Sequence, residues 1–372
     1  MPQSKPVLII AQSGRALAES AVKAGINAHV IDRFADQDTR KAAASTQVIG
    51  GTGSGFNTEQ LLAALAEFNN LPLMGVITGS GFEADIVMLD RVGQHTPLIG
   101  NSVDTVKRCK IPQLFFPMLD ELQIPYPDTR FNISDTGPGW LLKQIGGSGG
   151  EHISPLVNCV MTPENHYVQK KIEGQNLSVV FLADGNRSII IGINETWTVD
   201  SGQSDYRYAG AITLPEVDKN FYTLLDGYIT SLTKELHLKG LCGIDFIVDQ
   251  TGKCNVLEVN PRPVASFELH ENDCSLLQAH IMACTGKLIP GYKKMNSYKA
   301  HGIIYTQTDL AIPEVDWPVW VSDRPVSSKT ISSGMPVCTI HAEGKNLDAA
   351  KTLLNTRTNI MQNLIKQFQL AA

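Results

Sequence analysis

Short apolar runs alternate with amphipathic stretches through the first hundred residues. Strands are expected at 7–10, 28–31, 48–49 and 74–77, and helices at 15–24 and 59–68. Helices placed between short apolar strands predict a parallel, doubly wound sheet. Glycine-rich turns at 50–55 and 79–81 follow two of the strands, where such sheets hold ligands. The sequence lacks both Gly-x-Gly-x-x-Gly and the P-loop pattern, so we interpret these loops as backbone turns rather than as a nicotinamide site.

The pattern changes after residue 110, where helices and strands no longer alternate regularly. Helices are expected at 113–122, 218–236, 268–284 and 347–368. Strands are expected at 140–143, 167–172, 177–182, 188–193, 302–306, 319–321 and 337–341, with a hairpin across 243–260. The chain is therefore expected to combine an α/β unit with an α+β unit.

The hairpin carries the candidate metal chemistry. If residues 250–253 form its loop, Asp249 pairs with Cys254 and Asp245 lies opposite Glu258. Asn260 shares the polar face with Glu258, because side chains alternate along a strand. Opposed carboxylates are unfavourable without a cation, and oxygen ligands favour Mg²⁺ or Mn²⁺ over zinc. The alternative interpretation is a solvated acidic face on an ordinary surface hairpin.

Composition narrows the class of protein. With 18% charged and 43% hydrophobic residues, the chain is an ordinary globular protein. A net charge of −6 without a basic stripe gives no indication of nucleic-acid binding. The apolar run at 7–11 is too short for a signal peptide, and no stretch approaches the roughly 20 apolar residues of a membrane helix. Seven scattered cysteines predict reduced thiols and a cytoplasmic protein.

A lysine before a glycine-rich loop is a candidate phosphate clamp. Lys143 ends an expected strand and is followed by Gly146, Gly147, Ser148, Gly149 and Gly150, whose unhindered N–H groups can approach phosphates. Lys110 is a weaker local feature. The extended segment from Lys170 to Ile172 can contact an adenine, although on local evidence two strands turning at Gly174 are the preferred explanation.

The order of these elements resembles the ATP-grasp superfamily over about residues 1–290. The segments that carry the resemblance are the lysine and glycine-rich loop, then 167–180, then Asp245 with Leu-Glu-Val-Asn-Pro-Arg at 257–262. Within the superfamily, the chain looks like the group of predicted ATP-dependent carboligases related to biotin carboxylase. Segments 14–18, 79–83, 98–101, 208–211 and 336–340 point to this group. Its members occur in methanogens and in methylotrophs that use methanofuran-type cofactors.

The resemblance implies an ATP-grasp fold preceded by a Rossmann-like, doubly wound subdomain. Its expected divisions are residues 1–109, an ATP-grasp domain at 110–291 with a lid at about 135–195, and a C-terminal α+β segment at 292–372.

The resemblance also implies site roles. The residues expected to bind ATP are Lys110, Lys143, Gly146, Gly147, Ser148, Gly149, Gly150, Gln169, Lys170, Ile172 and Asn176. Asp245, Glu258 and Asn260 would hold Mg²⁺ (or Mn²⁺), and Arg262 would steady the charge on the transferred phosphoryl group. Relatives often have glutamate at the position of Gln169, whose amide oxygen still accepts a hydrogen bond from adenine.

Three functions are compatible with these residues. The favoured one is a carboxylate–amine ligase that acts through an acyl phosphate on small molecules, and a homodimer is compatible with it. The second is a bicarbonate-using carboxylase, but the expected glutamate base is replaced in register by Ser266, and Glu268 fits only after a two-residue shift. The third is a non-catalytic ATP sensor, which would not need the full metal set.

Substrate contacts are less defined by the sequence. Arg207 could bind a substrate carboxylate, although pairing with Asp205 or Asp200 is the simpler alternative. His270 and Glu271 are candidate bases for the amine, or residues on a helix surface.

Overall fold

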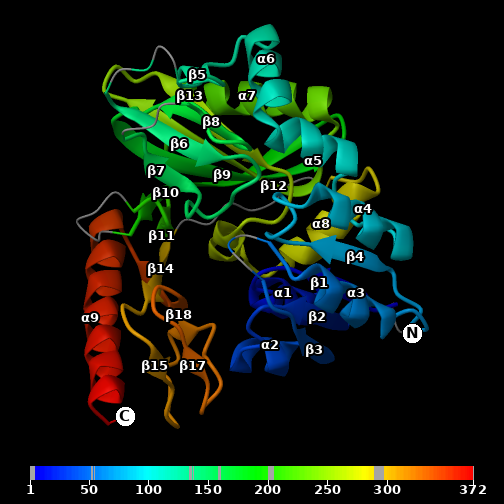
Figure 1. Cartoon of the computed structure of the whole chain (residues 1–372), viewed down its shortest axis with the longest axis vertical. Coiled ribbons are helices and arrows are strands. Elements are labelled where there is room, and N and C mark those ends of the chain that lie inside the picture. Colours follow the sequence, from blue (N-terminus) through cyan, green and yellow to red (C-terminus); the bar gives the residue numbers. More distant parts are fainter. Residues whose placement is uncertain are drawn as a thin grey trace.

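In the computed structural model the chain is described from residue 5 to residue 371, apart from residues 52, 54, 134, 135, 137, 158–160, 200–204 and 289–296. Asp200 and the expected boundary at 291 lie outside the described residues. Three parts are visible in Figure 1: an N-terminal α/β unit, a large sheet with its helices, and a C-terminal unit with a long helix. None of the helices in the described part combines the length and apolar character needed to cross a membrane.

The N-terminal unit is built on a four-stranded parallel sheet, as the sequence predicts. Its strand order is β3-β2-β1-β4, and all three strand pairs are parallel. The strands are β1 (Val7–Ile10), β2 (Ala28–Asp32), β3 (Ser45–Val48) and β4 (Gly75–Thr78). The helices are α1 (Arg15–Lys23), α2 (Gln37–Ala42), α3 (Thr58–Ala66) and α4 (Ile86–His95). The third strand begins three residues earlier than expected, and α2 and α4 were not predicted.

The acidic residue at the end of β2 is used by the backbone of this unit. Oδ2 of Asp32 accepts a hydrogen bond from the Gly14 N–H at 3.0 Å. Oδ1 accepts from Phe34 at 3.0 Å and from Ala35 at 2.7 Å. A dinucleotide site would need this carboxylate for a ribose, so the contacts favour a structural role for Asp32.

Two helices and a small sheet follow. Helices α5 (Val103–Lys110) and α6 (Pro112–Glu121) lead into a four-stranded sheet of order β5-β8-β6-β7. Its strands are β5 (Thr129–Arg130), β6 (Trp140–Gln144), β7 (Ile153–Pro155) and β8 (His166–Lys170). The expected lid at 135–195 also included the next two strands, but these pair in the large sheet instead, because β9 forms a long ladder with β12.

The central sheet has eight strands in the order β13-β12-β9-β10-β11-β14-β18-β16, and every neighbouring pair is antiparallel. The strands are β9 (Gly174–Asp184), β10 (Ser188–Thr198), β11 (Tyr208–Thr213), β12 (Lys239–Asp249), β13 (Cys254–Asn260), β14 (Tyr298–Tyr305), β16 (Val321–Ser322) and β18 (Pro336–Gly344).

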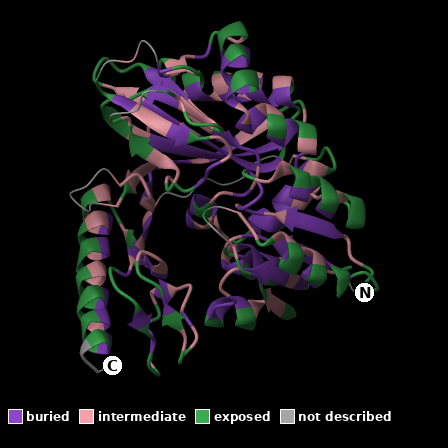
Figure 2. Cartoon of the chain, in the orientation of Figure 1, coloured by how far each residue is buried: buried purple, intermediate pink, exposed green. Residues whose placement is uncertain are grey.

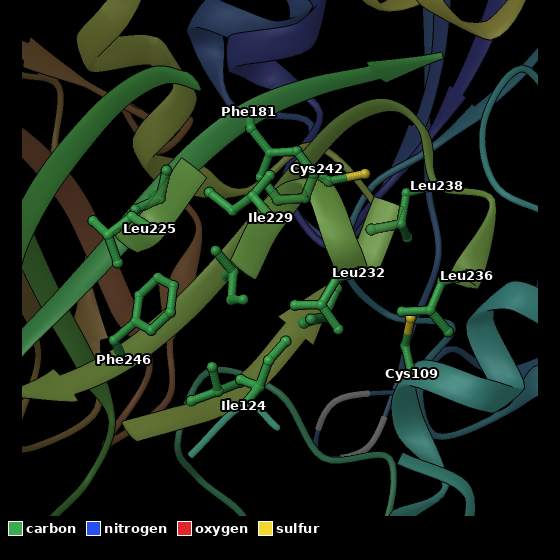
Figure 3. Packing of buried hydrophobic residues seen from close by; sticks show 14 of the residues in the cluster. Cys109, Ile124, Phe181, Leu225, Ile229, Leu232, Leu236, Leu238, Cys242 and Phe246 are labelled. Atoms are coloured by element: carbon green, nitrogen blue, oxygen red, sulfur yellow. The ribbon is translucent and has the colours of Figure 1, made fainter. Parts of the chain in front are cut away.

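One face of this sheet packs against α7 (Lys219–Leu236) and α6. Figure 3 shows Leu225, Ile229 and Leu232 of α7 gathered with Phe181 and Phe246 of the strands. These side chains are buried, and their period along β9 and β12 is two residues. Because side chains alternate along a strand, the polar residues of the same strands lie on the opposite face of the sheet.

The opposite face is covered by a short 3-10 helix, η1 (Ala265–His270), and by α8 (Leu276–Cys284). The sequence predicted one continuous helix over 268–284, which is wrong. The chain breaks at 271–275, because Ser275 caps α8 by accepting from the Gln278 N–H at 3.1 Å, and Oε1 of Glu271 accepts from the Leu276 N–H at 2.9 Å. Helix α8 packs between the sheet and α1, which joins the N-terminal unit to the large sheet.

The C-terminal unit completes the edge of the central sheet. Helix α9 (Leu347–Ala371) packs its buried side chains on β14 and β18, while its outer face is exposed (Figures 1 and 2). A two-stranded sheet of β15 (Leu310–Ala311) and β17 (Thr330–Ile331) lies in the same unit. The strand expected at 319–321 is shorter and shifted, since Val319 is 99% exposed and pairing starts at Val321.

Candidate active site

The β12–β13 hairpin places Asp245 directly opposite Glu258, which confirms the central geometric prediction. The expected pairing of Asp249 with Cys254 is wrong, since Val248 pairs with Cys254. The carboxylate of Asp249 instead accepts hydrogen bonds from N–H groups within the turn, including that of Lys253 at 3.0 Å. The turn is therefore one residue longer than the sequence suggested.

A β-bulge restores the register at the carboxylates. Phe246 pairs with Val256, and the next pair is Asp245 with Glu258, so Leu257 is the additional residue. The extra residue of a bulge changes the face of the sheet to which the following side chains point. Without it, the longer turn would have placed Asp245 opposite Leu257.

Lys110, at the end of α5, joins the two strands' polar side chains. Its Nζ donates to Oε2 of Glu258 and to Oδ1 of Asn260, both at 2.8 Å. Nδ2 of Asn260 donates to Oδ2 of Asp245 at 2.9 Å and to Oε1 of Glu258 at 3.3 Å. The structure thus brings all three expected metal ligands together with one of the two expected phosphate-binding lysines.

The electrostatics of this cluster are asymmetric. Burial and the neighbouring Glu258 carboxylate raise the pKa of Asp245 to about 8. Burial acts in the same sense on Glu258, but the Lys110 ammonium outweighs it and holds the pKa of Glu258 far below its usual range. When both Asp245 and Glu258 are ionised, Lys110 neutralises only one of the two negative charges. The donor atoms of Asp245, Glu258 and Asn260 are oxygens, so these three side chains fit a hard divalent cation. Since 34% of the Glu258 side chain is exposed, a ligand can reach it.

Arg262 links the hairpin to the N-terminal unit. Its Nε donates to Oε1 of Glu83, a buried residue in the loop after β4, and the two form an ion pair. Burial would raise the pKa of Glu83, but Arg262 and Lys110 together lower it. Sequence reasoning did not assign Glu83 a role, because its partner lies 179 positions away in the chain.

Lys143 and Gln169 face each other on the small sheet. Nζ of Lys143 donates to Oε1 of Gln169 at 2.7 Å, and Nε2 of Gln169 donates to Thr129 at 3.0 Å. Both side chains are buried, and burial lowers the pKa of Lys143 to about 8. A partly desolvated lysine beside a glycine-rich loop fits a polyanion such as a triphosphate.

The glycine-rich loop packs between two other parts of the chain. A Cβ on Gly146 would lie 2.3 Å from the carbonyl oxygen of Glu83. A Cβ on Gly150 would lie 1.8 Å from the carbonyl oxygen of Tyr206, and Gly150 has φ +84°. The carbonyl of Gly149 also accepts from the Tyr208 N–H at 2.9 Å. Only glycine permits so close an approach at Gly146 and Gly150.

A pocket lies between this loop and the hairpin. Its lining is Cys109, Lys110, Pro112, Phe115, Phe116, Gln144, Gly146, Gly147, His152, Tyr167, Leu257 and Glu258. His152 was missed by sequence reasoning, although it lies only two residues after Gly150. Its Nδ1 is buried and has no hydrogen-bond partner among the described residues, and burial lowers the pKa of His152 to about 4. A buried unpaired nitrogen in a pocket suits a ligand contact.

The remaining nucleotide candidates lie where the small sheet meets the central sheet. Nζ of Lys170 donates to the Pro138 carbonyl at 2.9 Å and lies 5.7 Å from the centre of the Trp140 ring. Ile172 follows β8, and Asn176 pairs with Ile247 on β12. Their roles toward a nucleotide stay predictions.

Arg207 has structural partners. It forms an ion pair with Asp205 at 2.6 Å, donates to the Gly334 carbonyl at 2.7 Å and lies 4.8 Å from the centre of the Tyr305 ring. These contacts match the structural alternative to a substrate-binding role. Binding of a substrate carboxylate by Arg207 stays a prediction.

The three side chains considered as bases are all engaged. Nε2 of His270 lies 2.9 Å from Oδ1 of Asn194, and burial lowers the pKa of His270 to about 3. Glu271 accepts from the Leu276 N–H and from Lys23. Glu268 binds Arg15 and His301.

Comparison with known proteins agrees with this architecture. Residues 114–266 match the family model described as an ATP-grasp domain. The chain therefore has the ATP-grasp fold, preceded by an α/β unit, and the expected fold class is confirmed. The match covers both the glycine-rich loop and the hairpin.

Three solved structures illustrate the relationship. Rhizobium etli pyruvate carboxylase matches with a TM-score of 0.73 and 14% identity over 95% of this chain, which spans only 37% of that protein. The L-amino acid ligase of Bacillus licheniformis matches with a TM-score of 0.72 and 12% identity, covering 96% of this chain and 98% of that one.

The third structure is the biotin carboxylase domain dimer of Hydrogenobacter thermophilus 2-oxoglutarate carboxylase, in complex with MgADP, ADP and bicarbonate. It has a TM-score of 0.70 and 14% identity, covering 91% of this chain and 86% of that one. At these identities the likeness shows a shared fold, and the matched structures include both an L-amino acid ligase and a carboxylase.

Proposed function

We propose that this protein is an ATP- and Mg²⁺-dependent carboxylate–amine ligase. The observation that carries the proposal is the contact of Lys110 with Glu258 and Asn260, which also bring in Asp245. A cationic phosphate ligand and an oxygen-rich metal site in direct contact suit transfer of a phosphoryl group. The match of residues 114–266 to an ATP-grasp domain supports the same class of nucleotide.

Each group has a part in the proposed reaction. Lys110, Lys143, His152 and the loop from Gly146 to Gly150 would hold the phosphates, and Gln169, Lys170, Ile172 and Asn176 would surround the nucleoside. Asp245, Glu258 and Asn260 would hold Mg²⁺, which neutralises charge on the phosphates when bound. Arg262, fixed by Glu83, would face the charge that develops on the transferred group.

The chemistry has two steps. A carboxylate oxygen attacks the γ-phosphorus of ATP, the bond to ADP breaks, and an acyl phosphate forms. An amine then attacks the acyl carbon, and phosphate leaves with the electrons of the C–O bond. The protein contributes positioning and charge neutralisation, which the lysines, Arg262 and the glycine loop can supply.

The sequence at 266 and the contacts of Glu268 both disfavour the bicarbonate-using alternative. Ser266 occupies the register position of the expected glutamate base, and Glu268 is held by Arg15 and His301. The carboxylate of Glu268 is therefore not free to act alone. The likeness to a biotin carboxylase domain keeps bicarbonate as a necessary arm of the experiment.

Within this class we propose glutamate ligation in the assembly of a methanofuran-like cofactor.

Oxygen transfer tests the mechanism: with ¹⁸O in the substrate carboxylate, one labelled oxygen should appear in the inorganic phosphate. Unlabelled phosphate would contradict an acyl phosphate. ATP binding without any ADP release would instead support a sensor.

A further inference from the structure

A chain of hydrogen bonds starts at Tyr208, the residue whose N–H donates to the Gly149 carbonyl of the glycine loop, and leads into the protein. The hydroxyl of Tyr208 lies 2.7 Å from Nε2 of His301, and Nδ1 of His301 lies 2.7 Å from Oε1 of Glu268. The other oxygen of Glu268 accepts from Arg15 of α1. The hydrogen-bond chain thus ends at the ion pair between Glu268 and Arg15.

The direction of these bonds follows from the charges. Burial would raise the pKa of Glu268, but Arg15 and the nearby histidines hold it well below its usual range, so Glu268 is a carboxylate. A carboxylate only accepts, so Nδ1 of His301 carries a proton, and in the neutral imidazole Nε2 is then the acceptor. Tyr208 then donates its hydroxyl hydrogen to His301, and the lone pairs of its oxygen can accept from a third group.

The hydrogen-bond chain lies on the same face of the sheet as the candidate metal ligands. Directly paired residues share a face, and one such row crosses the sheet through Glu258, Asp245, Ser178, Asn194 and Thr213. His301 pairs with Ala211, two residues from Thr213, and so belongs to the same face.

A second β-bulge brings Tyr208 onto this face. Ala211 pairs with Thr196 and Tyr208 with Thr198, and the register shift between Trp197 and Thr198 absorbs the additional residue. In a regular ladder Tyr208, three residues before Ala211, would face the other side. Burial and the Glu268 carboxylate hold the pKa of Tyr208 well above its usual range, and the Tyr208 N–H donates to the Gly149 carbonyl of the glycine loop.

We propose that Tyr208, His301 and Glu268 form a proton relay that accepts the proton of the attacking amine. The proposal rests on the ligase function and identifies the base for its second step. Tyr208 is the residue that touches the substrate, and His301 and Glu268 act through it. The other candidate bases, His270 and Glu271, are engaged elsewhere.

The lone pair of the amine forms the N–C bond, while the C–O bond to phosphate breaks and its electrons leave with phosphate. An N–H proton passes to the oxygen of Tyr208 as the Tyr208 hydroxyl proton passes to Nε2 of His301. The imidazolium is stabilised by the Glu268 carboxylate, and the proton returns by the same bonds to the phosphate product.

The experiment compares two nucleophiles on the same acyl phosphate. The wild type is assayed with ATP, Mg²⁺ and a panel of carboxylates that includes L-glutamate, first with hydroxylamine and then with tyramine. Hydroxylamine is uncharged at neutral pH and traps acyl phosphates without a strong base. In Tyr208→Phe and His301→Gln, amide formation with tyramine or another accepted amine should fall about 100-fold or more, while hydroxamate formation stays near the wild-type rate.

Matched controls separate chemistry from folding. Tyr126→Phe removes the same hydroxyl from an exposed hydrogen bond to Asp120, and His29→Gln makes the same change at an exposed contact with Ser45. Both should leave the two rates unchanged.

Two outcomes would overturn the relay: amide formation in both relay variants within about twofold of wild type, or an equal loss of hydroxamate and amide. Hydroxamate from no acid in the wild type would contradict the ligase function itself, and the relay with it.

Discussion

Nζ of Lys110 lies 2.8 Å from Oε2 of Glu258, so a residue expected to bind phosphate is in direct contact with a residue expected to bind metal. The Lys110 ammonium offsets the charge of Glu258 and holds the pKa of its carboxyl far below the usual range. We infer that a bound metal–nucleotide complex would separate Lys110 from Glu258. Lys110 would then contact a phosphate, and Glu258 would contact the cation. Binding of nucleotide and metal would then be coupled through one side-chain pair.

Glu258→Gln should abolish phosphoryl transfer without loss of the fold. The amide keeps the shape but loses the charge that a divalent cation requires, so ADP release should fall about 100-fold or more. The control is Glu195→Gln, the same change in a β10 residue that pairs with Lys351. Steady-state ADP release and the thermal midpoint are the measurements, and retained turnover would rule out the metal assignment.

Lys143→Ala should weaken ATP binding about 10- to 100-fold, the usual value for a charged hydrogen bond. Lys351→Ala removes a lysine of α9 that is paired with Glu195 and should have little effect. Titration calorimetry with ATP measures both. Unchanged affinity in Lys143→Ala would contradict the phosphate-clamp interpretation.

The affinity for ATP should depend on pH through Lys143. In the free protein its pKa is lowered to about 8, so it is charged below that pH and neutral above it. Bound phosphates favour the charged form and raise the pKa, so the affinity should be flat below pH 8 and fall by up to tenfold per unit above it. In Lys143→Arg, which stays charged, the fall should be smaller. An identical pH profile in wild type and variant would refute this prediction.

Gly150→Ala should impair catalysis more than Gly149→Ala. Both glycines have positive φ, so both changes strain the backbone. Only at Gly150 would the new Cβ meet the Tyr206 carbonyl, at 1.8 Å, whereas nothing lies within 4 Å of a Cβ on Gly149. The difference in turnover between the two variants isolates the packing of the loop on Tyr206. Equal turnover would mean that this packing is not needed.

The sequence predicted the fold where local periodicity and long-range pairing agree. The alternating pattern around Asp245 and Glu258 placed these residues opposite each other, although the prediction of the turn at Asp249 was wrong and a bulge at Leu257 compensated. The helix expected over 268–284 failed, because Ser275 and Glu271 use side chains to end one element and begin the next. Such capping competes with apolar periodicity, which a helix pattern alone does not reveal.

The candidate site was predictable only in its local parts. Lys143 and the glycine loop are adjacent in sequence, whereas Glu83 meets Arg262 from another unit. His301 and Tyr208 meet across β11 and β14 only because a bulge turns Tyr208 onto the right face. No pattern in one sequence encodes these distant contacts, since they depend on strand order and register.

The most direct test is ADP release by the wild-type protein with ATP and Mg²⁺ against a panel of carboxylates, each with and without amines such as tyramine or glutamate, and with bicarbonate in a parallel arm. We expect ADP release that requires one acid, and stoichiometric amide when one amine is added. Release with bicarbonate alone, or tight ATP binding with no ADP release under any condition, would contradict the account of this protein as a carboxylate–amine ligase.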